Sequence, residues 1–269
     1  MLGDKYKKLK KDYYMYGKLM NESLKVLIEN KKALFKALIL PILFLLVITL
    51  LFPNIIDKGK MVFEDNIIKI ISILLGIITL LINLSIAVSV HRIILIKDDI
   101  SLIKSVATTK REVDFFGKSL ILVILSGLVF IVVFFFSMAL FRIFILDTQL
   151  LTICSIAFSG LLASIIFSRF SMILPSVAID KKMDFLDTLE FTKNYKFLSL
   201  FMVVIFPFII AILIAVVYGI VIKFFSVIIS SYFEILYVFL NVFITVLVIS
   251  CLSVTYSYIE KENNQKKFL

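Results

Sequence analysis

The chain has 269 residues, of which 61% are hydrophobic, and it carries a formal net charge of +10. This apolar fraction exceeds that of ordinary soluble domains, which are only about half apolar, and the mean hydropathy of +1.09 is correspondingly high. The composition therefore excludes an ordinary soluble domain. The basic residues lie beside apolar runs, which is typical of cytoplasmic loops and anionic lipid surfaces. The positive charge therefore does not indicate nucleic-acid binding.

Six apolar runs are long enough to cross a membrane, which takes about 20 residues of helix. They cover approximately residues 34–52, 67–90, 119–141, 150–174, 198–222 and 233–257. Each run is continuous rather than alternating, and lipid accepts only spans whose backbone bonds are satisfied internally. The sequence thus predicts an all-α integral membrane protein with six transmembrane helices over 34–257 and a tail over 258–269.

Lys and Arg are distributed unevenly between the segments that connect these spans. Twenty-four of the 29 fall in residues 1–36, 91–118, 169–196 and 258–269. The other five lie at the opposite ends of the spans, at Lys58, Lys60, Lys69, Arg142 and Lys223. By the positive-inside rule, this distribution predicts that both termini are cytoplasmic.

Residues 1–33 carry apolar side chains at spacings of three and four. The members of this stripe are Tyr6, Leu9, Tyr13, Tyr16, Met20, Leu24 and Leu27, and lysines occupy the other faces. The pattern predicts a basic amphipathic helix, which we expect to lie on the inner leaflet beside the first span. Binding to a partner protein, as in calmodulin targets, would use the same features.

The two inner loops, 91–118 and 169–197, have a similar order of landmarks. Each begins with an arginine, continues through acidic residues and a Thr-Lys pair, and ends with an aromatic residue. The landmarks are Arg92, Thr109-Lys110 and Phe115 in the first loop, and Arg169, Thr192-Lys193 and Phe197 in the second. The order indicates either a parallel repeat or a chance similarity in a biased composition.

We expect a short interfacial helix in each loop. In the second loop Asp184 suits the N-cap, and Asp187 lies near the positive end of the helix dipole. Acids among lysines on such a surface helix indicate a solvated face rather than paired catalytic carboxylates.

Arg169 lies inside the fourth apolar run, about 9 Å along the helix from Pro175, which ends or kinks that helix. Three interpretations remain open. The arginine is a membrane anchor, or it forms a structural ion pair with Asp180 as first candidate and Glu190 as second, or it binds an anion or lipid phosphate. The last interpretation adds Arg92, Lys110 and Lys193 as candidate cations.

Small residues recur at spacings of three and four along the fourth span and therefore share one helix face. The centre of this face is formed by Ser159, Gly160, Ala163 and Ser164. Such faces let helices approach closely. Packing inside the molecule, a homodimer seam and a groove for an acyl chain would all use it. In other spans, Asn83 and Asn241 are expected to bond neighbouring helices, and Pro41 and Pro207 to kink their helices.

The sequence offers little chemistry for an enzyme or for a cofactor. Cys154 and Cys251 lie in apolar runs outside any Cys/His cluster, and His91 is the single histidine. One histidine cannot build a zinc site, and a nucleotide-binding loop is missing from the sequence. We therefore expect no metal and no cofactor.

The two inner loops resemble those of a bacterial membrane family. The motifs that carry the resemblance are Arg169-Phe170-Ser171, Leu174-Pro175, Ile179-Asp180, Phe185-Leu186-Asp187 and Thr192-Lys193-Asn194, with His91-Arg92, Lys110-Arg111-Glu112 and Phe115-Phe116 in the first loop. They are similar to the YciC-like inner-membrane proteins, which are related to the membrane domain of glycerophosphoryl diester phosphodiesterases. The chain departs from that family in lacking Trp near 189–191. The phosphodiesterase activity belongs to a separate soluble domain and does not carry over.

The resemblance implies a six-helix domain in the bacterial inner membrane, connected with lipids or the cell envelope. Together with the charge pattern, it favours a non-enzymatic protein that binds anionic lipid headgroups, a membrane protein partner or a second copy of itself. The alternative is a small transporter or permease for a lipid-related solute. Against that alternative, no Asp, Glu, Lys or Arg lies near the middle of any predicted span.

Overall fold

The computed structural model describes residues 2–62 and 65–267, and side-chain surroundings for 15–51 and 66–266. The described residues contain six helices that are long and apolar enough to cross a membrane. These spans are Lys31–Leu51, Asn66–Ile96, Lys110–Phe141, Thr148–Ala178, Lys196–Ile228 and Ser231–Lys266. The prediction of a six-span, all-α membrane protein is confirmed.

The helices follow one another with short connections. The elements are α1 (Leu2–Glu29), α2 (Lys31–Val62), α3 (Asp65–Ile96), α4 (Lys110–Phe141), α5 (Thr148–Phe170), α6 (Ile173–Ala178), α7 (Phe185–Phe191), α8 (Lys196–Leu200), the π-helical turn η1 (Phe201–Ile205), α9 (Phe206–Ile228), the 3₁₀ turn η2 (Ser231–Ile235) and α10 (Leu236–Lys267). Of the two expected loop helices, α7 is present with Asp184 at the predicted N-cap, and Asp187 forms a capping box with it. The first loop instead forms turns before α4 begins, so that expectation is wrong.

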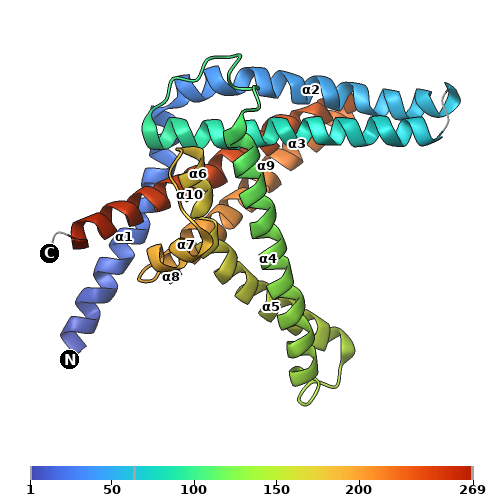
Figure 1. The fold of residues 1–269 in the computed structure, drawn as a ribbon. Helices are drawn as coiled ribbons and strands as arrows, with labels where there is room; N and C mark the ends of the chain where they lie inside the picture. The colour runs from blue at the N-terminus through green and yellow to red at the C-terminus, as the bar shows by residue number, and fades with distance from the viewer. Residues whose placement is uncertain (1, 63–64, 268–269) are drawn as a thin grey trace.

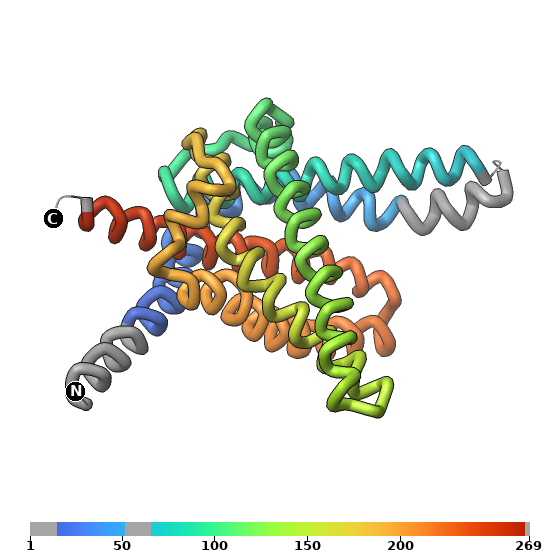
Figure 2. Tube along the Cα trace, turned by 60° about the horizontal axis from the view of Figure 1, so that its bottom comes forward, coloured from blue at the N-terminus to red at the C-terminus, as the bar shows by residue number. Residues whose placement is uncertain are grey.

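Neighbouring long helices form antiparallel pairs, α2 with α3 and α4 with α5 (Figure 1). In both views the α4–α5 pair diverges from α3, and the pairs meet only toward the end that carries the loops (Figure 2). There Val88, Phe115 and Ala178 join α3, α4 and α6 in a small apolar cluster. The two termini lie on the same side of the molecule.

α10 is the central helix of the fold. Half of its most apolar window is buried, whereas only 6% of the corresponding window of α4 is. α10 packs against α1, α2, α3 and α9 and bears small hydroxyl residues where they approach. Ser250 donates to the carbonyl of Ser23 in α1 at 2.7 Å. The exposed apolar side chains of α4 therefore face the lipid rather than other helices.

The described half of the N-terminal helix packs on the protein. Tyr16, Met20 and Leu27 contact the core formed by α10 and η1, while Leu24 remains exposed. The described part of the apolar stripe is thus largely covered by neighbouring helices instead of lying open to the inner leaflet. The predicted positions Tyr6, Leu9 and Tyr13 lie outside the residues whose side chains are described.

Both prolines expected to disturb the later spans lie at helix breaks. Pro175 has no N–H for the carbonyl of Ser171, and α5 ends at Phe170 before α6 begins. Pro207 follows the π-helical turn η1 at the start of α9. Pro41 lies within the continuous α2.

The small-residue face of α5 is used inside the molecule. Ser155, Ser159 and Ala163 are buried in α5, which packs on α4. Gly160 and Ser164 lie partly exposed beside this face, and a Cβ on Gly160 would meet nothing within 4 Å. Gly160 is therefore not the point of close approach that the sequence suggested.

Asn83 does not connect helices as expected. Its amide donates to the carbonyl of Thr79 one turn earlier in α3, at 2.8 Å. Asn241 is exposed on α10.

Candidate functional site

The loop between α3 and α4 and the loop between α6 and α7 are joined at Asp180. Arg111 at the start of α4 donates to both carboxylate oxygens of Asp180, at 2.8 Å and 2.9 Å. Arg92 at the end of α3 donates to the same carboxylate at 3.0 Å and to Asp98 at 2.7 Å. Bidentate arginine–carboxylate pairs are strong and directional. These four side chains, which we call the loop junction, fix one loop against the other and cancel in charge.

The backbone also places Asp180 for this role. The N–H groups of Asp180 and Lys181 donate to the carbonyls of Val177 and Ser176, at 3.1 Å and 2.8 Å. This pattern is a Schellman motif, which ends a helix with one residue in the left-handed region. Asp180 occupies that position with φ of 60°. For a residue with a Cβ, this left-handed conformation is unfavourable by roughly 1 kcal/mol. The ion pairs of Asp180 with Arg92 and Arg111 offset this cost.

The same contacts change the acidity of Asp180. Its pKa is lowered below the usual value, first because Arg111 hydrogen-bonds the carboxylate, and further because of Arg92. Partial burial opposes this shift. The carboxylate therefore stays ionised, and the junction stays intact, throughout the physiological pH range.

Arg169 has different partners from those the sequence suggested. Its guanidinium donates to the carbonyl of Leu189 at 2.6 Å and to the hydroxyl of Thr192 at 3.0 Å. The expected ion pair with Asp180 is wrong, because Asp180 is held by arginines of the first loop. Glu190 is exposed on α7 and is not the partner either.

Arg92 and Arg169 nevertheless make the same kind of contact, a hydrogen bond to a carbonyl near the end of a short helix. Arg92 donates to the carbonyl of Ala178, the last residue of α6, at 3.1 Å. Arg169 donates to Leu189 near the end of α7. The last carbonyls of a helix lack partners within it and carry its negative dipole end, so a guanidinium there satisfies both needs. Each arginine thus fastens a short helix to a membrane span.

The other landmarks of the proposed repeat do not share their roles. Thr109 is the N-cap of α4, in a capping box with Glu112. Thr192 is instead the C-cap of α7 and accepts from Arg169. The two loops therefore agree in their arginines and differ in their Thr-Lys pairs.

The four cations predicted for lipid or anion binding do not form a single site. Arg92 and Arg169 are engaged by the protein, as described above. Lys110 is exposed at the first turn of α4 beside Arg111. Lys193 is exposed after α7 and faces the end of α10, in a cavity that includes Asn263.

His91 is buried and hydrogen-bonded to a neighbouring helix. It is 1% exposed, and its Nδ1 lies 2.7 Å from the hydroxyl oxygen of Ser253 in α10. Because the Ser253 hydroxyl donates to Ile249, His91 donates through Nδ1. Its ring lies 5.9 Å from that of Phe115. His91 thus marks the meeting of α3, α4 and α10, and no grouping of three His, Cys, Asp or Glu able to hold a metal is found in the described part of the chain.

A groove opens between α4 and the loop from α6 to α7. Its volume is about 980 Å³, and lysines line both walls. Lys118 on the α4 wall lies 3.5 Å from Asp184 and 5.3 Å from the centroid of the Phe185 ring. Sequence reasoning missed Lys118 and Arg111, although Lys118 is the last charged residue before an apolar run and Arg111 immediately follows the predicted Lys110.

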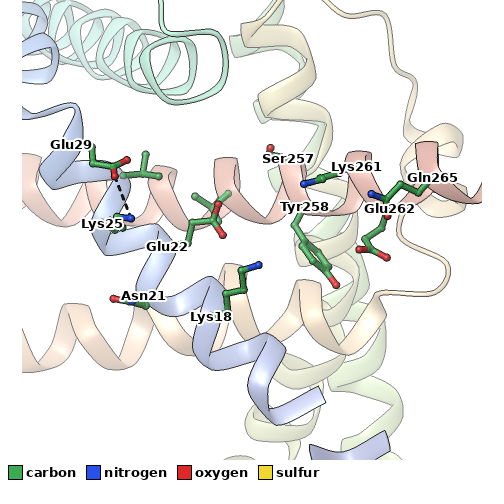
Figure 3. A pocket seen from close by; sticks show the side chains of 12 residues that line it. Lys18, Asn21, Glu22, Lys25, Glu29, Ser257, Tyr258, Lys261, Glu262 and Gln265 are labelled. Atoms are coloured by element: carbon green, nitrogen blue, oxygen red, sulfur yellow. Dashed lines mark ion pairs between the residues drawn. The ribbon is translucent and has the colours of Figure 1, made fainter. Parts of the chain in front are cut away.

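A second cavity, of about 650 Å³, lies between α1 and α10 (Figure 3). Its charged lining residues are Lys18, Lys25, Lys261, Glu22, Glu29 and Glu262. The signs balance, and Lys25 pairs with Glu29 at 3.5 Å. This cleft therefore has no preference for an anion.

Comparison with protein-family models, curated proteins and solved structures gives no match to this chain. The fold and its cavities therefore have to be interpreted from their own geometry.

Proposed function

We propose that this protein is a non-enzymatic membrane component whose loop end associates with anionic lipid headgroups of the inner leaflet. The observation that carries the proposal is the composition of the surface around α7 and α8. There Lys182, Lys193 and Lys196 are exposed, and Leu186 and Phe197 are 79% and 78% exposed beside them. Apolar side chains among lysines at the edge of spans suit the boundary between headgroups and acyl chains.

Electrostatics gives the size of this effect. A lysine near an anionic leaflet contributes roughly 1 kcal/mol of attraction, which decays within a Debye length. The proposal places the loop end in the cytoplasm of a bacterial cell, at its inner membrane, with both termini on that side. It also includes a distant relationship to the YciC-like family and its connection with the cell envelope, for which the two loop motifs are the support.

The proposal is tested by measuring which lipids surround the reconstituted protein. Electron spin resonance of spin-labelled lipids gives the association of an anionic lipid relative to phosphatidylcholine. We expect enrichment of the anionic lipid that falls with added salt and in a variant with Lys193 and Lys196 changed to Gln. The matched control changes Lys69 and Lys223 to Gln, two lysines at the other ends of the spans. Equal association of both lipids, or equal effects of both variants, would refute the proposal.

A specific observation also supports the alternative of a transporter for a lipid-related solute. The fifth span is interrupted by η1 before Pro207, and π-helical turns are frequent at functional sites. This alternative predicts solute flux into proteoliposomes that changes when Pro207 is replaced by Ala. Absence of flux for a panel of glycerophosphodiesters would count against it.

A further inference from the structure

The groove between α4 and the α6–α7 loop has one wall formed by a single helix face. Lys110, Asp114, Gly117, Lys118 and Ile121 line it at helical spacing. Val177, Asp180 and the segment 181–184 form the opposite wall. The groove therefore runs along α4 from polar loop residues to the apolar Ile121. This volume lies at the upper end of the range of about 300–1,000 Å³ for ligand sites.

The sequence of α4 fixes the level of this groove in the membrane. After Lys118, residues 119–141 contain no charged side chain, and Arg142 follows. These 23 residues of helix span about 34 Å, close to the roughly 30 Å thickness of the hydrocarbon core. Lys118 thus lies at the boundary where lipid phosphates are found. Ile121, one turn deeper, is half-exposed and lies at the level of acyl chains.

Only some of the charged side chains in the groove form ion pairs within the protein. Arg111 and Asp180 belong to the loop junction, and Lys181 pairs with Glu260 of α10. Among the described residues, Lys110, Lys182 and Asp114 form no ion pair. Lys118 pairs with Asp184, whose side chain is 84% exposed, and such surface pairs contribute only about 0–1 kcal/mol. A phosphate can therefore replace Asp184 at little cost.

We propose that this groove binds one phospholipid whose headgroup carries a phosphate and a primary amine. Lys118 and Lys182, from opposite walls, hold the phosphate, and Asp114 accepts hydrogen bonds from the ammonium group. One acyl chain then lies over Ile121 and continues along the exposed apolar face of α4. The inference rests on the lipid binding of the proposed function, but it names a defined site in place of general attraction to the surface.

Lipid selectivity follows from the mixed charge of the lining. A trimethylated choline cannot donate hydrogen bonds to Asp114, and an uncharged glycerol headgroup leaves that carboxylate unpaired. Phosphatidylethanolamine and phosphatidylserine both supply the required pair of groups.

Gly117 provides a way to close the groove. A Cβ at this position would meet nothing within 4 Å, so a leucine side chain can enter the open space without displacing the backbone. Gly127 lies on the same helix and is equally open, but it is away from the groove. Gly117→Leu should therefore exclude the lipid, whereas Gly127→Leu is the matched control.

The experiment is native mass spectrometry of the full-length protein released from nanodiscs of equal phosphatidylethanolamine, phosphatidylcholine and phosphatidylglycerol. We expect one retained phosphatidylethanolamine per protein. Its occupancy should fall about tenfold in Lys118→Ala, as expected for the loss of one charged hydrogen bond of about 1.4 kcal/mol, and should be lost in Gly117→Leu. Gly127→Leu and Lys261→Ala should bind like the wild type.

Two outcomes would overturn the inference. One is retention of all three lipids in equal amounts, and the other is equal occupancy in Gly117→Leu and Gly127→Leu. Circular dichroism and size-exclusion chromatography establish that both leucine variants are folded, and Lys118→Gln provides a second variant. If spin resonance shows enrichment of anionic lipid but native mass spectrometry finds no lipid retained in the groove, the proposed function stands. Only the lipid site in the groove is then refuted.

Discussion

Asp180 should be the residue on which the contact between the two loops depends most. Two contributions to stability oppose each other at this position. Its pairs with Arg92 and Arg111 are partly exposed, since 57% of the Asp180 side chain is accessible. Surface ion pairs are worth about 0.2–1 kcal/mol each, with bidentate geometry at the upper end, so the two together contribute about 1.5 kcal/mol. The left-handed backbone, in contrast, costs about 1 kcal/mol, which a glycine would remove.

These magnitudes predict an order of stability. Asp180→Ala loses the pairs and adds about 0.5 kcal/mol of strain, because alanine tolerates the left-handed region less well than aspartate, so its free energy of unfolding should fall by about 2 kcal/mol. Asp180→Asn tolerates the left-handed region and should lose about 1.5 kcal/mol. Asp180→Gly loses the pairs but relieves the strain, with a net loss of about 0.5 kcal/mol.

The assay is equilibrium unfolding by SDS in mixed micelles, followed by far-UV circular dichroism. Arg111→Gln alone and combined with Asp180→Asn completes a double-mutant cycle, whose coupling energy should be about 1 kcal/mol. A glycine variant more stable than the wild type would show that strain outweighs the ion pairs. An alanine variant as stable as the glycine variant would show that the left-handed backbone carries no cost. Either result would refute the reasoning.

Acidification should remove the advantage of the wild type over Asp180→Asn. Because the folded-state pKa of Asp180 is lowered, its stabilisation is present above the unfolded pKa of about 3.9 and is lost as pH falls below it; a constant difference in melting temperature between pH 7 and pH 3 would contradict this. His91→Ala should lower the free energy of unfolding by about 3 kcal/mol in the same SDS titration, because it leaves a cavity and removes the hydrogen bond that the buried Ser253 hydroxyl accepts. Arg169→Ala should increase hydrogen exchange in α7 with little change in α4, since its two bonds end on Leu189 and Thr192. Single cysteines in a cysteine-free background at Leu146, which is 99% exposed, and at Lys193 should react with an impermeant maleimide from opposite sides of the membrane.

The spans could be predicted from sequence because hydropathy is a local property. The spans of the structure cover the predicted runs to within one residue, and most of them extend further at the loop end, as with α4, which begins at Lys110 rather than at 119. The N-cap of α7 at Asp184 and the place of Asp187 in its first turn were equally predictable, since both residues lie within one helical turn.

Partners distant in sequence could not be predicted in the same way. Arg169 and Asp180 are close neighbours in the chain, yet the backbone reversal at Asp180 turns its carboxylate toward α3 and α4. Asn83 was expected to connect two helices, but it satisfies its amide within α3. Sequence spacing indicates which residues can meet on one helix, and it contains no information on which helix lies opposite.

The sequence by itself determined that this is a six-span membrane protein, because lipid requires long apolar helices and apolar length is readable along the chain. It also located the basic segments that should face an anionic leaflet. Only the tertiary structure decided which cations remain available for a ligand. Arg92 and Arg169 satisfy helix carbonyls and carboxylates, whereas Lys118 and Lys182 line an open groove. The physical reason is that a charged side chain is available to a ligand only if the groups packed against it do not already bind it. Those groups come from other helices, so their identity depends on the tertiary structure.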